Sequence, residues 1–109
     1  MRSATRKRVG RDPAYRNWIL LQPCIVMKVW KELVNQKLRF VTGHHVKRGP
    51  GAPKEDRRMV PLMDFLHMRT HEIPGQPCVE RGKKVFEEFW GVDLEREIGR
   101  LNAEYEAQR

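Results

Sequence analysis

The chain has 109 residues, of which 39% are hydrophobic and 33% charged, and its formal net charge is +8. This length is enough for one domain with a modest core. No apolar run reaches the ~20 residues that a membrane-spanning helix needs, and two cysteines are fewer than a small disulfide-rich secreted domain normally carries. We therefore expect one intracellular, cytoplasmic domain with reduced cysteines and no membrane partner.

The positive charge is concentrated in the first half of the chain. Residues 1–58 contain 15 Lys and Arg against 4 Asp and Glu, whereas residues 59–109 contain 7 against 10. A strong basic excess is typical of proteins that bind polyanions. DNA is therefore the expected partner, and a solvated basic surface is the alternative interpretation.

The N-terminal residues predict an arm followed by a helix. Residues 1–12 are basic and nearly free of large apolar side chains, so we expect a flexible arm ahead of a single domain, 13–109. Asp12 followed by Pro13 is a helix-start signal. The predicted helix ends before Pro23, and its apolar face consists of Tyr15, Trp18, Ile19 and Leu21.

The middle of the chain predicts extended structure and a loop. Residues 24–42 favour a hairpin or irregular ribbon that leads into His44 and His45, with a helix from Val29 to Leu38 as the alternative. Residues 47–58 contain two prolines and two glycines, which predicts a loop. Residues 59–62 are apolar and predict a short strand or turn.

Helices dominate the predictions for the second half. We expect one from about Met63 to Glu72, before Pro74. A second, from 79 to 90, has an apolar stripe of Val85, Phe86, Phe89 and Trp90 and ends at Gly91. Asp93 caps a last helix with apolar positions Leu94, Ile98, Leu101 and Tyr105. The expected fold class is α+β.

All four histidines fall into two pairs, which predicts a metal site. His44 and His45 are adjacent, and on a strand they would point to opposite faces. His67 and His71 are spaced i, i+4, and on a helix their side chains would lie about 6 Å apart. Three histidines can bind one divalent ion while a fourth acts as a base. Mg, Mn, Ni and Zn all remain open as its identity.

Several motifs together resemble the HNH, or ββα-metal, nuclease superfamily, and in particular small phage and prophage proteins of the recombination-associated type. The matching segments, in chain order, are Pro23-Cys24, His44-His45, Asp56, Val60-Pro61-Leu62, His67, His71, Phe86-Glu87 and Gly91-Val92-Asp93-Leu94. They cover residues 12–105. The arrangement of the histidines also resembles the colicin-type DNases. The resemblance implies a small ββα-metal core with a two-stranded ribbon crossed by a helix, and flanking N- and C-terminal helices.

The resemblance also implies roles for individual residues in a metal-dependent DNA endonuclease. By analogy, His44, His67 and His71 would hold the metal, and His45 would be the catalytic base. Asp56 would support the loop. Met27 and Met63 stand where the family has cysteines, and Leu66 stands where it has a histidine, so no structural zinc site of four cysteines is expected.

The basic loop supplies the candidates for nucleic-acid binding. Four of its cations are expected to contact phosphates: Arg48, Lys54, Arg57 and Arg58. Two other functions are open. One is a non-catalytic nucleic-acid-binding protein on a degenerate HNH scaffold, and the other is a protein-interaction module whose histidines hold a structural metal.

Overall fold

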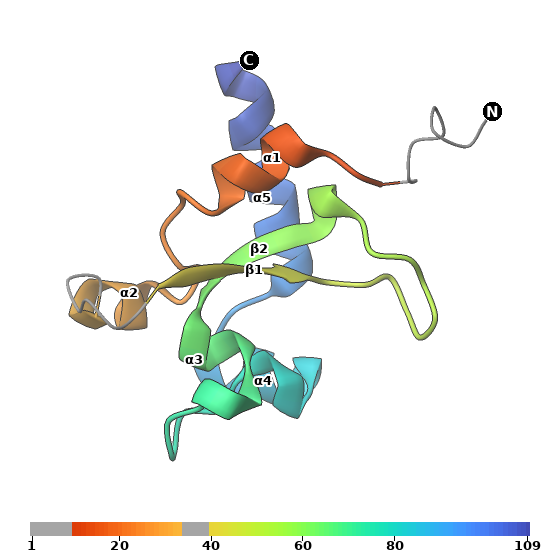
Figure 1. Ribbon diagram of the computed structural model, residues 1–109. Coiled ribbons are helices and arrows are strands. Elements are labelled where there is room, and N and C mark those ends of the chain that lie inside the picture. The colour runs from red at the N-terminus through yellow and green to blue at the C-terminus, as the bar shows by residue number, and fades with distance from the viewer. Residues whose placement is uncertain (1–9, 34–39) are drawn as a thin grey trace.

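A two-stranded antiparallel ribbon lies at the centre of the computed structural model, which describes residues 10–33 and 40–109 (Figure 1). Strand β1 (Val41–His45) pairs with β2 (Met59–Met63), so that Val41 lies opposite Met63 and His45 opposite Met59. All five residues of β2 are buried. The predicted α+β class with a two-stranded ribbon is confirmed.

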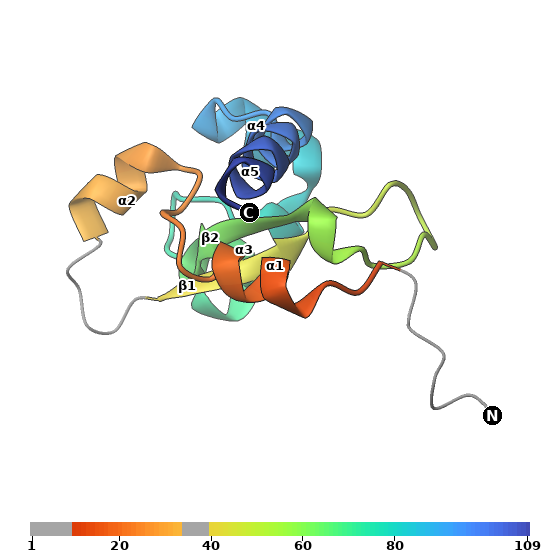
Figure 2. The same ribbon diagram turned by 90° about the horizontal axis from the view of Figure 1, so that it is seen from above.

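The helices surround this ribbon. Figure 2 shows α4 (Lys83–Trp90) and α5 (Leu94–Gln108) along one side of it, and the loop after β1 extending beyond its end. The core includes the fully buried Tyr15, Phe65 and Phe86. Within the described residues, no helix is long and apolar enough to cross a membrane.

Helix α1 (Pro13–Ile19) begins where the sequence predicts. The side chain of Asp12 accepts the N–H of Tyr15 at 3.2 Å, and Pro13 occupies the first helical position, where its missing N–H costs nothing. Tyr15 and Ile19 are buried. Leu21, expected on the apolar face, is 82% exposed because the helix ends at Ile19.

The hairpin predicted within residues 24–42 is wrong. Its first half contains α2 (Met27–Leu33), and the partner of β1 is β2 instead. Val26 and Val29 are both buried at a spacing that suits one face of a helix, which outweighs the β-propensity of this segment. The alternative helix, from Val29 to Leu38, is found as far as Leu33, and its second half lies outside the described residues.

The continuous helix predicted from Met63 to Glu72 is also wrong. Helix α3 (Asp64–His67) ends after one turn, Met68 is extended (φ −117°, ψ 131°), and a 3-10 turn, η3 (Arg69–His71), follows. The N–H of Arg69, which a continuing helix would use internally, donates instead to the Glu80 carboxylate at 2.8 Å. The i, i+4 relation expected for the last two histidines is therefore lost.

The ends and caps of the C-terminal helices follow the sequence signals, but the helix predicted from residue 79 begins only at Lys83. After the turn η4 (Val79–Arg81), α4 ends at Gly91, whose left-handed φ of +68° suits glycine. Asp93 caps α5 by accepting the N–H of Arg96 at 3.1 Å. In the predicted stripe of α4, Phe86 is buried, but Val85 and Phe89 are exposed.

Candidate metal and catalytic site

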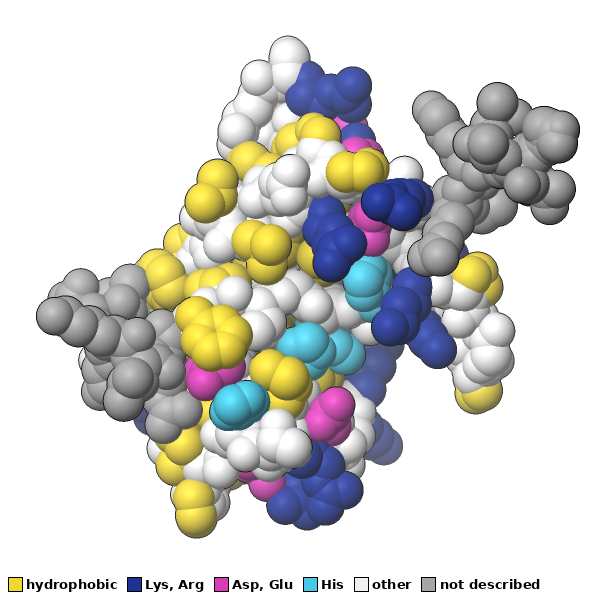
Figure 3. All heavy atoms as spheres, in the orientation of Figure 1, with side chains coloured by type: hydrophobic (Ala, Val, Ile, Leu, Met, Phe, Trp, Pro, Cys, Tyr) yellow, Lys and Arg dark blue, Asp and Glu magenta, His cyan; other side chains and the backbone are white. Residues whose placement is uncertain are grey.

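Two histidines from different elements converge beside the ribbon. The ring of His44, on β1, and the ring of His67, the last residue of α3, have centroids 5.0 Å apart. Histidine side chains reach the surface near the middle of the face shown in Figure 3. His44 and His67 are both half-buried, so the pair is accessible to a ligand from solvent.

Thr42 determines which nitrogen of His67 is available. The hydroxyl of Thr42 lies 2.9 Å from the carbonyl oxygen of Leu62 and 2.7 Å from Nδ1 of His67. Because a hydroxyl has one proton, and the carbonyl can only accept it, the Thr42 oxygen accepts the Nδ1–H of His67. Nε2 of His67 then has a free lone pair, as a metal ligand requires.

The protonation of the pair also suits a cation. Burial, together with the nearby rings of His67 and His45, lowers the pKa of His44 to about 4. Burial likewise lowers the pKa of His67, although Glu80 opposes this. Both imidazoles are therefore neutral at pH 7, the form that binds a metal. His44 and His67 fit the metal that the family resemblance implies, as two of its ligands.

His45, which follows His44 on β1, forms a hydrogen-bonded pair with Asp56, and its charge is one of the causes that lower the pKa of His44 and of His67. Nε2 of His45 lies 2.8 Å from Oδ1 of Asp56. An ionised carboxylate can only accept, so Nε2 carries the proton and Nδ1 is left with a lone pair. A carboxylate in this role fixes the tautomer and stabilises the imidazolium that forms when the base takes a proton.

Asp56 is itself held by the segment before α1. Its second oxygen, Oδ2, accepts the N–H of Asp12 at 2.8 Å, and its own N–H donates to the carbonyl of Gly10 at 2.7 Å. Burial raises the pKa of Asp56, but hydrogen bonds from His45 and Asp12 outweigh this, and the net pKa is lowered. Asp56 is therefore ionised at neutral pH.

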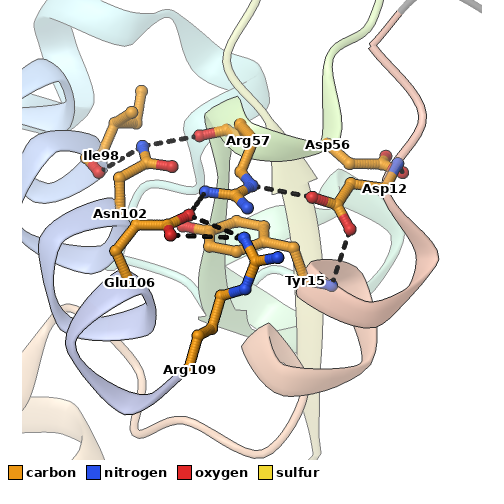
Figure 4. Close-up of polar contacts among 8 residues, drawn as sticks. All are labelled: Asp12, Tyr15, Asp56, Arg57, Ile98, Asn102, Glu106 and Arg109. Carbon is orange, nitrogen blue, oxygen red and sulfur yellow. Dashed lines mark hydrogen bonds and ion pairs between the residues drawn. The ribbon is translucent and has the colours of Figure 1, made fainter.

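Arg57 links this segment to the C-terminal helix (Figure 4). Its Nε donates to Asp12 at 2.8 Å and its Nη1 to Glu106 at 2.6 Å. The guanidinium lies 4.8 Å from the ring centroid of Tyr15 and 4.9 Å from that of Tyr105. The structure thus places Arg57 among four intramolecular partners.

The other three candidate cations of the loop differ in their exposure and in the carboxylates with which they pair. Arg58 is 8% exposed, donates to the carbonyl of Val46 and pairs with Glu95. Arg48 is exposed and pairs with Glu55 at 2.8 Å. Lys54 is exposed, and its charge is one of the causes that lower the pKa of His67. Of the four candidate cations, Lys54 is thus an exposed one whose charge acts on a histidine of the pair.

His71 does not join the other histidines. It is exposed on η3, and its nearest described aromatic contact is Phe40, with ring centroids 6.4 Å apart. Among residues 10–33 and 40–109, no group of three or more His, Cys, Asp or Glu side chains is arranged to hold a metal ion. The predicted three-histidine group thus reduces to His44 and His67, because the chain turns away at Met68.

Two further contributors were not predicted from sequence. Thr42 precedes His44 by two residues, so the alternation of a strand would have placed both on one face. Asp12 was recognised as a helix cap, but nothing in the sequence links its backbone N–H to Asp56. Both cysteines, Cys24 and Cys78, are free and buried, which agrees with the expected reduced state.

Comparisons with known proteins do not identify the chain. No protein-family model matches it, and neither the curated proteins nor the solved structures contain a match.

Proposed function

We propose that the protein is a metal-dependent endonuclease that hydrolyses phosphodiester bonds in DNA and is built on an HNH-like, ββα-metal core. The observation that carries this proposal is that the neutral His44–His67 pair and the His45–Asp56 pair start from adjacent residues of β1, and that the charge of His45 lowers the pKa of both His44 and His67. The chain order β1, β2, α3 also agrees with a ribbon followed by a helix.

The two pairs have separate roles in this proposal. His44 and His67 would hold one divalent ion. Such an ion, when bound, would supply Lewis-acid stabilisation of the negative charge that develops on the phosphate and on the leaving oxygen. Mg, Mn, Ni and Zn remain the candidates for this ion.

His45 activates the nucleophile. Its Nδ1 takes a proton from water as the water oxygen forms a bond to phosphorus and the bond to the leaving oxygen breaks. Asp56 stabilises the resulting imidazolium, since its carboxylate lies 2.8 Å from Nε2. His45 is thus the catalytic base and Asp56 the residue that positions it.

Exposed cations near the site bind the DNA backbone. Lys54 is favoured because its charge is one of the causes that lower the pKa of His67. Arg16, an exposed residue of α1, is a second candidate, because its charge helps to lower the pKa of Asp56. Each would neutralise a phosphate and contribute to salt-dependent binding, without reading the base sequence.

Cleavage of plasmid DNA tests the proposal. A supercoiled plasmid and a single-stranded DNA circle should be cut when Mg²⁺, Mn²⁺, Ni²⁺ or Zn²⁺ is added and stay intact with chelator. His45→Ala should abolish cleavage but retain metal binding, measured by calorimetry. His44→Ala and His67→Ala should weaken metal binding, and His71→Ala should not. Cleavage by His45→Ala at the parental rate would overturn the assignment.

A second candidate function is DNA binding without cleavage. It is favoured by one observation, that two histidines rather than three converge at the candidate site among the described residues. This function predicts a gel shift that weakens steeply with salt, and no cleavage with any of the four metals.

A further inference from the structure

Three residues at the start of the ribbon face the same side of it. Thr42 and His44 on β1 both contact His67, as expected for alternate residues of a strand. Phe40 immediately precedes β1 and continues this alternation. Its carbonyl accepts the N–H of Asp64 at 2.9 Å, which extends the pairing beyond the last strand residue.

Phe40 lies at one end of the row formed by Phe40, Thr42 and His44, and its aromatic ring is exposed. Its side chain is 53% exposed, and its ring lies against His71 in an edge-to-face arrangement, with an interplanar angle of 77°. His71 is exposed as well. At about 3.3 Å per residue, Phe40 lies about 13 Å from His44 along the row. A nucleic-acid strand bound at His44 and His67 would pass this aromatic pair.

Resting on the proposed function, we propose that Phe40, supported by His71, is a stacking platform for an unpaired base, and that the preferred substrate is single-stranded DNA. An exposed phenyl ring is a surface on which any base can stack, so it binds without sequence preference. In a duplex, the bases are stacked on one another and their faces are not available. A platform beside the cleavage site therefore favours an unpaired strand.

In this arrangement His71 has a role that does not involve a metal. The imidazole meets Phe40 edge to face, a favoured geometry for aromatic pairs, and it restricts the position of the phenyl ring. A ring held in place loses less conformational freedom when a base stacks on it than a freely rotating side chain would. His71 is thus a positioning residue for Phe40.

Equilibrium binding in the presence of chelator tests the platform without cleavage. Fluorescence anisotropy would compare a labelled single-stranded oligonucleotide with a duplex of the same sequence. The parent should bind the single strand more tightly. Phe40→Leu keeps an apolar side chain but removes the ring, and should weaken single-strand binding about 5-fold or more. Phe40→Tyr should retain the parental affinity.

Phe89→Leu is the matched control. Phe89 is 55% exposed and also contacts an aromatic neighbour, Trp90, but it lies on α4 beside a groove lined by Lys28 and Gln76. Phe89→Leu should bind both DNAs like the parent. Thermal unfolding of each variant would establish that a loss of affinity does not come from a loss of fold.

The outcomes separate this inference from the proposed function. Parental single-strand affinity in Phe40→Leu, an equal loss in Phe89→Leu, or tighter binding of duplex would overturn the platform, even if metal-dependent cleavage is found. A Phe40-dependent preference for single strands without cleavage in any metal would support the platform and overturn the nuclease. Absence of DNA binding would overturn both.

Discussion

The carboxylate of Asp56 lies 2.8 Å from Nε2 of His45 and determines which nitrogen of that imidazole is free to accept a proton. The two residues belong to different elements, since His45 ends β1 and Asp56 begins the 3-10 turn η2 (Asp56–Arg58). Their hydrogen bond joins the two ends of the loop between β1 and η2, and it fixes the orientation of the proposed catalytic base, His45.

We expect Asp56→Asn to lower the cleavage rate about 100-fold or more. An amide can donate to Nε2 as well as accept from it, so the variant admits the wrong tautomer, and it cannot stabilise the imidazolium. Single-turnover cleavage with saturating metal would measure the loss. Metal affinity, measured by calorimetry, should stay at the parental value because the hydrogen bonds of Asp56 run to His45 and Asp12 and not to the metal-binding pair. A parallel loss of metal binding would contradict this separation of roles.

Thr42→Val should weaken metal binding about 10- to 100-fold. Valine has nearly the shape of threonine but no hydroxyl, so Nδ1–H of His67 loses its acceptor and the ring is free to turn. Thr42→Ser keeps the hydroxyl and should bind metal like the parent. Calorimetric titration with Ni²⁺ or Zn²⁺ would compare the three proteins, and equal affinity in Thr42→Val would show that this hydrogen bond does not orient the ligand.

The half-buried imidazole of His44 should make the fold less stable in acid. Its pKa is about 4 in the folded protein and about 6.5 in an unfolded chain, so between these values the unfolded state binds more protons. Stability therefore rises with pH across this window and is lost as the pH falls from about 6.5 to about 4.

Urea denaturation in chelator at several pH values would measure this dependence. In His44→Gln the change in unfolding free energy between about pH 4 and 6.5 should be smaller, because one linked proton is gone. Part of the slope should remain, since burial also lowers the pKa of His67. An identical slope in parent and variant would show that His44 is solvated in the folded protein.

The parts of the fold that sequence predicts well are those specified by local chemistry. The cap at Asp12, the stop at Gly91 and the cap at Asp93 each depend on contacts within a few residues, and all three are found. The strand pairing was not predictable in this way. β1 pairs with β2 across the loop, and the choice of partner depends on which apolar run is buried by α1 and α5.

The arrangement of the candidate site residues depends on tertiary contacts that the sequence does not specify. His44 and His67 converge because α3 packs against β1, a tertiary contact that sequence spacing only suggests. His71 lies apart because α3 ends at His67 and Met68 is extended, and the N–H of Arg69 donates to Glu80 instead of continuing the helix. The roles of Arg57 and Arg58 also depended on carboxylates of α5, which are distant in sequence.

Arg57 should matter for stability more than for DNA binding. Its guanidinium pairs with Asp12 and Glu106 and lies between the rings of Tyr15 and Tyr105, so it joins α1, the loop and the end of α5. Two cation–π contacts and two partly exposed ion pairs together contribute about 2 kcal/mol, or roughly 10 °C in Tm. We expect Arg57→Ala to lose about this much.

Two comparisons identify the cause of that loss. Arg57→Lys should recover only part of the stability, because an ammonium group cannot bind both carboxylates in a planar arrangement or stack between two rings. Arg96→Ala removes an exposed arginine from the same helix that carries Glu106, α5, and should change the unfolding free energy by less than about 0.5 kcal/mol. If instead Arg57→Ala unfolds like the parent and binds DNA more weakly, Arg57 acts as the phosphate contact that the sequence alone had suggested.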